Sequence, residues 1–245
     1  QSMYFFNFRS PVRYPISYIE KIIPMLLCLF FIFLTLVFHK RICSSKKLDR
    51  SLRILMFLLL LTSLITEYSL RYIQVGINRR SLPLHLCTIA AILSLVFIIT
   101  NSKKLFSFLF SGCIPGAALA IIGPGIGRAS NHIQYYTFMM LHILVIVVPI
   151  FYYSIYDYRI NLKSHLKVML LLQICALFVG VANDYFGTFY WYITYTRNMF
   201  AGTTLAFLGS GPVYFLHFEF LTLLMFTLWF LVYRVFNYLY SKYVK

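Results

Sequence analysis

Charged residues are scarce in this chain, and acidic residues are the scarcest. Only 11% of the 245 residues are charged, with 6 Asp and Glu against 22 Lys and Arg, while 61% are hydrophobic. A soluble domain cannot hide that much apolar surface, so this composition excludes an ordinary water-soluble fold and predicts a protein embedded in a bilayer. The basic residues lie mainly in short loops between apolar runs. We attribute them to membrane topology and anionic headgroups, and we expect no nucleic-acid partner.

Cysteine and metal-binding patterns are also sparse. The five cysteines are an odd number and three of them lie inside apolar runs, so no disulfide framework is indicated. The sequence has no HExxH, CxxC or DxD pattern, and we expect neither a metal site nor a cofactor. The stretch GPGIG at residues 123–127 lacks the strand–helix context and the lysine of a nucleotide-binding loop, so we interpret it as a flexible turn.

Long apolar runs dominate what is present. About 20 apolar residues in a helix cross the hydrocarbon core of a bilayer, and runs of this kind recur along the whole chain. The expected fold class is therefore all-α, a polytopic membrane helix bundle that forms a single transmembrane domain over residues 1–245. We predict about seven spans, at residues 16–38, 52–74, 83–100, 105–123, 134–156, 166–186 and 212–236. Residues 187–211 are too interrupted for a span and predict a re-entrant or surface-lying segment.

The distribution of basic residues sets the expected orientation. The loops after the first, third, fifth and seventh runs, with the adjoining ends of the runs, hold 14 of the 22 Lys and Arg, and the opposite side holds 8. The positive-inside rule then places the N-terminus outside and the C-terminus inside, in a multi-pass protein of the cell membrane. The first run has no small-residue cleavage site, so we expect a retained span. We interpret Gln1, Ser2 and Met3 as a tag remnant.

With this orientation, almost every ionisable residue inside the spans lies in the outer half. A charged side chain costs ~2.5–3.5 kcal/mol at a helix centre, so polar groups on several helices at one level predict a shared, outward-facing cavity. The alternative is that each group reaches the outer interface separately. We prefer this alternative for His132, whereas the deeper Glu67, His142 and Asp184 favour the cavity. The polar groups at this level are Glu67, Arg71, His85, Cys87, Arg128, His132, His142, Asn183, Asp184, Arg197, His217 and Glu219.

The spacing of two pairs adds detail. Glu67 and Arg71 are four residues apart, so a helix places them on one face as an ion pair. The pair is either purely structural, or its arginine binds a lipid phosphate. The spacing does not decide between these two roles. His85 and Cys87 are two residues apart, which is about 200° around a regular helix. A His85–Cys87 dyad therefore requires a break in the backbone, and without one Cys87 is a packing residue.

Five short blocks carry a family resemblance. They are LPLHLC (82–87), GAALAIIGP (116–124), MLHILVIVVPIF (140–151), NDYFGTFYWY (183–192) and LGSGPVYFL (208–216). In order and spacing, over roughly residues 80–220, they resemble bacterial YwaF-type membrane proteins and the animal transmembrane protein 164 acyltransferases. The resemblance implies phospholipid acyl transfer within the membrane and carries over His85 and His142 by position. In the animal proteins a cysteine directly precedes the first histidine as the proposed nucleophile, but Leu84 stands there in this chain. Cys87 substitutes for it, or histidine acts without a thiol, or the chemistry differs.

Acyl transfer needs a base for the hydroxyl proton and a group that stabilises the oxyanion. We expect His85 or His142 to be the base, with Asp184 or Glu67 orienting its imidazole. The residues expected to bind the substrate are Arg71, Arg128 and Arg197 at the phosphate, Asn183 and Tyr214 at the ester oxygen, and His217 in the cavity. An outward site has no access to acyl-CoA, so a membrane phospholipid is the expected donor and the enzyme is a transacylase.

A transporter or a lipid-binding membrane protein with the same cavity is the main alternative. The fourth run is interrupted by Gly112, Pro115 and Gly116, and a broken segment precedes the seventh run, as in transporters with moving helices. The absence of an evident internal repeat counts against this alternative. A non-catalytic sensor or assembly factor is a third reading, and the residues alone do not choose between enzyme and non-enzyme or fix the oligomeric state.

Overall fold

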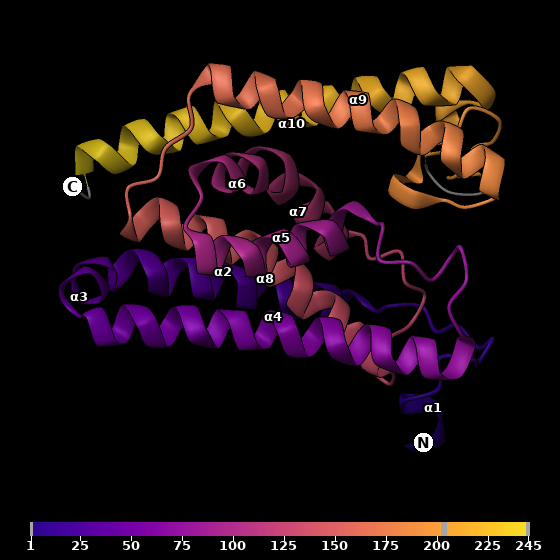
Figure 1. The fold of residues 1–245 in the computed structure, drawn as a ribbon, viewed down its shortest axis with the longest axis horizontal. Coiled ribbons are helices and arrows are strands. Elements are labelled where there is room, and N and C mark those ends of the chain that lie inside the picture. Colours follow the sequence, from indigo (N-terminus) through magenta and orange to yellow (C-terminus); the bar gives the residue numbers. More distant parts are fainter. Residues whose placement is uncertain (1, 202–204, 244–245) are drawn as a thin grey trace. The chain divides into compact units, whose positions relative to one another are not determined.

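The computed structural model describes residues 2–201 and 205–243, and every regular element in these residues is helical (Figure 1). The elements are α1 (Ser2–Phe5), α2 (Tyr18–Val37), α3 (His39–Ser44), α4 (Lys46–Val75), α5 (Leu86–Thr100), α6 (Lys103–Phe108), the π-helix η1 (Leu109–Cys113), α7 (Ile114–Ile122), α8 (Ile133–Ile155), α9 (Leu162–Phe186), the 3₁₀ turns η2 (Tyr190–Tyr192) and η3 (Ala206–Leu208), and α10 (Gly211–Tyr243). The predicted all-α fold class is confirmed.

Five helical stretches are long and apolar enough to cross a membrane. They are Tyr18–Val37, Lys103–Ile122, Ile133–Ile155, Leu162–Phe186 and Gly211–Lys242. The other two predicted spans are also helical, but neither meets the same test. The predicted span of α4, residues 52–74, contains the charged residues Arg53, Glu67 and Arg71. α5, with 15 residues, is about 22 Å long against a hydrocarbon core of about 30 Å. That α4 and α5 each cross the membrane therefore stays a prediction.

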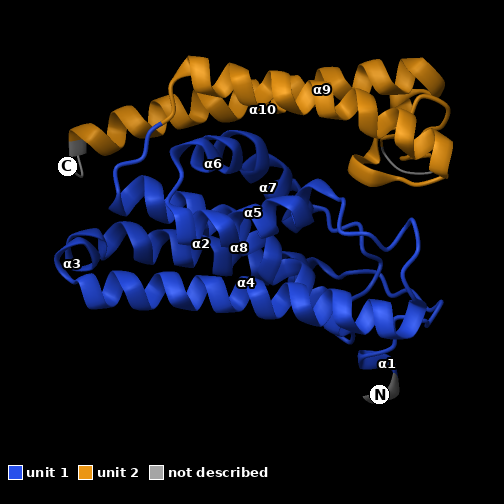
Figure 2. Ribbon diagram, in the orientation of Figure 1, with its two compact units in different colours: residues 1–159 blue, residues 160–245 orange. Residues whose placement is uncertain are grey.

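The chain forms two compact units, residues 1–159 and residues 160–245 (Figure 2). In unit 1, α8 is the central helix and packs against α2, α4, α5 and α7. Val145, Val148 and Tyr152 of α8 have no exposed surface. In unit 2, α9 and α10 pack together, and between them residues 187–201 and 205–210 form no helix beyond the short turns η2 and η3. The prediction of one transmembrane domain is not tested by this division.

Side-chain caps fix where the helices begin and end. α2 starts with a capping box, in which Ser17 Oγ accepts from the Glu20 backbone N–H and the Glu20 carboxylate accepts from the Ser17 N–H. Asn161 caps α9 by accepting from the Ser164 N–H at 2.8 Å. α9 ends at Gly187, whose φ of 65° is the left-handed conformation that glycine adopts without strain.

The fourth predicted span contains a π-helical turn that the sequence analysis did not predict. Pro115 has no N–H to donate to the carbonyl of Ser111, four residues earlier, so regular α-helical pairing fails at this point. The turn before the proline is the π-helix η1, and all five of its residues are buried. The proline therefore changes the hydrogen-bond register without ending the helix, which continues as α7.

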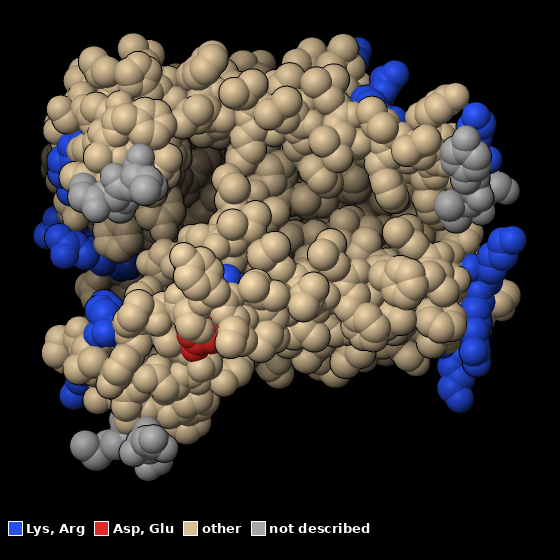
Figure 3. Space-filling view, turned by 180° about the vertical axis from the view of Figure 1, so that it is seen from behind, with Lys and Arg blue, Asp and Glu red and all other residues tan. Residues whose placement is uncertain are grey.

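Apolar side chains cover the lipid-facing surfaces of the candidate spans. On α10, Leu228, Val232 and Val235 are each more than half exposed. On the face drawn in Figure 3, Lys and Arg side chains gather toward the ends of the helices, and the broad band between them is almost free of charge. This distribution is what contact with hydrocarbon requires, because exposed charges are costly there.

Candidate functional site

Polar side chains of α4 and α8 meet at one end of unit 1. The carboxylate of Glu67, near the end of α4, accepts hydrogen bonds from Gln134 Nε2 at 3.0 Å and from Thr137 Oγ1 at 2.8 Å, both at the start of α8. Arg71, one turn further along α4, forms an ion pair with the same carboxylate. The predicted i,i+4 ion pair is confirmed, and it is part of a network that ties α4 to α8.

The start of α5 lies beside this network. The hydroxyl oxygens of Tyr68 on α4 and Thr88 on α5 are 2.9 Å apart. His85 lies within electrostatic reach of Arg71, and Cys87 within electrostatic reach of Glu67. Three helices therefore contribute to one group of polar side chains. We call it the Glu67 cluster; its members are Glu67, Tyr68, Arg71, His85, Cys87, Thr88, Gln134 and Thr137.

The backbone break that a His85–Cys87 pair requires is present. α5 begins at Leu86, and His85 is its N-cap residue, with an extended backbone at φ −64° and ψ 142°. The separation of about 200° in a regular helix therefore does not apply to this pair. Leu84, which directly precedes His85, lies in the same non-helical stretch and is 45% exposed.

His142 lies deeper in unit 1, on α8. Its side chain is 2% exposed, and its Nδ1 is 2.7 Å from the carbonyl oxygen of Phe138. Because a carbonyl only accepts hydrogen bonds, Nδ1 carries the proton and Nε2 keeps its lone pair. Thr137 of the Glu67 cluster is five residues earlier, about 7.5 Å along the helix axis. His142 is therefore in the tautomer in which Nε2 can act as a base, and it lies further along α8 than the cluster.

Arg128 holds the N-terminal segment of unit 1. Its guanidinium donates to the backbone carbonyls of Asn7 and Phe8 at 3.1 Å and of Ser10 at 3.2 Å. The ring of Phe8 lies 5.8 Å from the guanidinium of Arg128 and 5.8 Å from that of Arg71. Arg128, predicted at a lipid phosphate, therefore donates to the backbone of the N-terminal segment, and the Phe8 ring of that segment also lies near Arg71 of the Glu67 cluster.

His132 is fully buried, so the expectation that it reaches the interface separately is wrong. Its Nδ1 accepts from the Gln134 backbone N–H at 3.0 Å, and its Nε2 lies 3.2 Å from the carbonyl oxygen of Asn7, to which it donates. Burial, reinforced by the positive charge of Arg128, lowers the pKa of His132 from 6.5 to about 4. The neutral imidazole is needed here because the cationic form cannot accept the Gln134 bond.

In unit 2, Asn183 organises the segment that follows α9. Its side-chain amide donates to the carbonyls of Tyr190 at 2.7 Å and Ile193 at 2.8 Å. Its Oδ1 accepts from the Thr188 hydroxyl at 2.6 Å and from the Tyr190 N–H at 3.0 Å. Both amide hydrogens of this fully buried residue are engaged, so Asn183 fastens the irregular segment to the end of α9.

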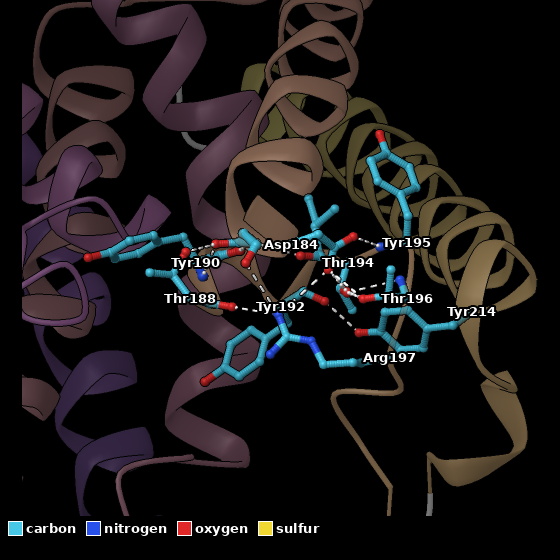
Figure 4. A network of polar contacts seen from close by, with 11 residues as sticks. Asp184, Thr188, Tyr190, Tyr192, Thr194, Tyr195, Thr196, Arg197 and Tyr214 are labelled. Carbon is cyan, nitrogen blue, oxygen red and sulfur yellow. Dashed lines mark hydrogen bonds and ion pairs between the residues drawn. The ribbon is translucent and has the colours of Figure 1, made fainter. Parts of the chain in front are cut away.

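Asp184 and Arg197 extend this network (Figure 4). Asp184 accepts from the hydroxyls of Thr194 and Thr196 and from the Tyr195 N–H at 2.7 Å. Arg197 lies 3.6 Å from the Asp184 carboxylate and donates to the Thr188 carbonyl at 3.0 Å. The carboxylate that the sequence analysis assigned to a histidine is therefore surrounded by donors of its own unit.

Tyr214 and His217, at the start of α10, also bond to backbone. The hydroxyl of Tyr214 donates to the Tyr192 carbonyl, and the Nδ1 of His217 lies 3.0 Å from the Leu208 carbonyl oxygen. Two of the residues predicted at the substrate therefore hold Tyr192 and Leu208 against the start of α10.

A second polar cluster lies at the opposite ends of α4 and α8. The Asp49 carboxylate accepts from the Tyr156 hydroxyl at 2.7 and 2.8 Å, and Arg53 donates to the Ile98 carbonyl at 2.8 Å. The sequence analysis did not single out Asp49 and Arg53, although their i,i+4 spacing was a signal. Within residues 2–201 and 205–243, no group of three or more His, Cys, Asp or Glu is arranged to hold a metal ion.

The comparison with protein families identifies the family of this chain. A protein-family model described as the TMEM164 family matches residues 14–232, which is most of the chain. No curated protein and no solved structure matches it. Together with the five candidate spans, the match shows that this chain is an integral membrane protein that belongs to the TMEM164 family.

Proposed function

We propose that this protein is a lipid acyltransferase of the cell membrane, a transacylase that moves an acyl chain between phospholipids. The observation that carries the proposal is the Glu67 cluster, where an imidazole and a thiol lie within electrostatic reach of an arginine–carboxylate ion pair that is bonded to the start of α8. These groups match the needs of acyl transfer, which are a base, a nucleophile and a cation for the phosphate. The family resemblance of the sequence supports the same activity.

The proposal includes a topology of seven spans. α4 and α5 cross the membrane with the five longer apolar stretches, the N-terminus lies outside and the C-terminus inside. The Glu67 cluster then lies beneath the outer leaflet, where phospholipids are present and acyl-CoA is not. A phospholipid therefore serves as acyl donor and a lysophospholipid as acceptor.

In the proposed reaction, His85 takes the proton from the acceptor hydroxyl as its oxygen attacks the donor's ester carbonyl. The tetrahedral intermediate then collapses, the ester bond to the donor's glycerol oxygen breaks, and the imidazolium returns the proton to that oxygen. Arg71 binds the lipid phosphate, and Glu67 keeps the arginine in place. Asp184, with its own donors in unit 2, is not needed for this step.

Two further residues have assigned roles that variants can separate. His142 is the second candidate for the base, because its fixed tautomer leaves Nε2 free to accept a proton. Cys87 is the candidate nucleophile for a two-step route through a thioester. We expect Cys87→Ser to abolish a two-step route and to leave direct transfer by His85 largely intact.

The test uses purified protein in liposomes with a phospholipid labelled in one acyl chain and an unlabelled lysophospholipid. Mass spectrometry should find the label on the former acceptor and the donor converted to its lyso form, with no acyl-CoA present. Labelled lipid that changes leaflet without covalent change would instead establish the transport alternative, which the π-helical break of η1 favours. The proposal fails if the donor keeps its chain in the presence of active, folded protein.

A further inference from the structure

Glu219, in α10, is the one acidic side chain with a buried oxygen that has no hydrogen-bond partner in residues 2–201 and 205–243. The residue is 7% exposed and lies within a candidate membrane span. The chain has six acidic residues. The carboxylates of the other five, Glu20, Asp49, Glu67, Asp157 and Asp184, accept hydrogen bonds or form ion pairs.

The neighbours of Glu219 in unit 2 leave this oxygen open. Gln173 of α9 hydrogen-bonds to the Glu219 carboxyl group, so the two helices share a polar pair. Tyr195 and Tyr214 lie within electrostatic reach of Glu219. Their hydroxyls, however, donate to the carbonyls of Leu177 and Tyr192. Neither tyrosine therefore satisfies the open Oε2.

A buried carboxyl oxygen without a hydrogen-bond partner, such as Glu219 Oε2, is a candidate binding point for a ligand. A buried acceptor without a partner costs about 1–3 kcal/mol, so native proteins keep few of them without a reason. No cluster for a metal ion is present in the described part of the chain. Glu219 is eight residues inside α10 from Gly211, about 12 Å along the axis, which is below the level of charged headgroups. A neutral hydroxyl can donate to the carboxyl group at that depth and accept from the Gln173 amide.

We infer that Glu219 and Gln173 form a hydrogen-bonding site for the hydroxyl of a membrane lipid. Lysophospholipids and diacylglycerols have a free hydroxyl on the glycerol that carries their acyl chains, whereas diacyl phospholipids have no free hydroxyl on that glycerol. The inference depends on residues of unit 2 alone and does not require the Glu67 cluster to be catalytic. The lipid-hydroxyl site therefore does not depend on the acyl-transfer proposal, and the acyl-transfer proposal does not depend on this site.

The experiment uses an apolar carbodiimide, which reacts from the lipid phase with carboxyl groups that have no cationic partner. Applied to the full chain in phosphatidylcholine liposomes, the reagent should modify Glu219, as read by peptide mass spectrometry. Glu67 is the matched control, because its ion pair with Arg71 should protect it. Lysophosphatidylethanolamine or diacylglycerol should slow the modification of Glu219 about tenfold at ten times its Kd. Diacyl phosphatidylethanolamine should not slow it.

The arms of the experiment separate the sources of the hydroxyl. Protection by the lysophospholipid alone or by diacylglycerol alone identifies the ligand, and protection by both supports a site for the shared group. Gln173→Leu should reduce the protection while Glu219 still reacts, since the variant removes one half of the site. Failure of Glu219 to react, or equal protection by diacyl phosphatidylethanolamine, would overturn the inference.

Discussion

His132 is a histidine that the fold uses only in its neutral form. Both ring nitrogens are engaged, one as acceptor from Gln134 and one as donor to Asn7. Protonation removes the acceptor and places a second positive charge beside Arg128. The imidazole therefore links the start of α8 to the N-terminal segment through two hydrogen bonds, and protonation at acid pH breaks the one from Gln134.

Stability should fall as the pH is lowered through the titration range of His132. The folded-state pKa is about 4 and the ordinary value is 6.5, so between these values the unfolded chain binds more protons. The contribution is complete above pH 6.5, declines below it and reaches a loss of at most about 3 kcal/mol near pH 4. Tm in detergent, followed from pH 7 to pH 4, should drop more for the wild type than for His132→Gln. Equal slopes for the two proteins would contradict this role.

Asn183 should be among the least replaceable polar residues of unit 2. Asn183→Asp keeps the shape but loses both donors, which leaves the carbonyls of Tyr190 and Ile193 without their bonds. At about 1–3 kcal/mol for each buried group left unsatisfied, we expect a loss of roughly 2–5 kcal/mol. Chemical denaturation in detergent measures it, and Asn198→Asp, at an exposed bond in the same segment, is the control. A variant as stable as the control would show that the network is dispensable.

Sequence reasoning found most of these polar residues but not their partners. Asn183 and Arg128 were expected at the substrate, and their donors instead bond to backbone carbonyls. Such bonds form where a chain turns back on itself, as residues 7–10 and 188–193 do, and no residue pattern marks the carbonyl that will be reached. The Glu67–Arg71 pair was predictable because both partners lie on one helix.

At the scale of the element, Gly180 lets the segment after α9 lie against that helix. A Cβ at this position would lie 2.6 Å from Cε2 of the Tyr195 ring and 3.1 Å from Cγ2 of Ile193. The tyrosine is held in place by its hydroxyl, which donates to the Leu177 carbonyl at 3.0 Å, and by its N–H, which donates to Asp184. The glycine is therefore a packing requirement within a helix.

Gly180→Ala should loosen the segment while leaving α9 helical. Alanine favours the helix by up to about 1 kcal/mol, but overpacking costs about 1–3 kcal/mol, so the net effect is destabilising. Hydrogen exchange at residues 193–197 should rise while exchange within α9 stays slow. In the double variant with Tyr195→Ala, most of the penalty of the alanine should disappear, because the closer of the two contacts is removed. A penalty that persists without the tyrosine ring would refute the steric explanation.

The elements themselves were largely predictable. Each of the seven predicted runs is helical, because apolar length alone signals a helix in a membrane. The boundaries moved where capping residues decided them, as at Ser45, which starts α4 seven residues before the predicted span. η1 was missed because a proline in an apolar run indicates an interruption, but not whether the helix stops or changes register.

At the scale of the whole molecule, the proposed topology places Cys43 in the cytoplasm. Cys43 is the one exposed cysteine of the five, all of which lie in the described part of the chain. In sealed right-side-out vesicles, a membrane-impermeant maleimide should leave Cys43 unlabelled until the vesicles are opened, with Cys43→Ser as the blank. Partial desolvation and the nearby carboxylate of Asp49 raise the pKa of its thiol, so labelling should be done at mildly alkaline pH. Labelling of intact vesicles would reverse the orientation and place the Glu67 cluster beneath the inner leaflet.

The proposed function places acyl transfer at the polar groups where α4, α5 and α8 meet. The most direct measurement is the initial rate of acyl transfer in liposomes for two histidine variants matched in their chemistry. His85→Gln removes a base from the Glu67 cluster, and His132→Gln alters a histidine whose bonds are all to backbone. We predict a loss of at least about 10²-fold for His85→Gln, the usual contribution of a general base, and a change within about twofold for His132→Gln. Equal rates for His85→Gln and the wild type would contradict the claim.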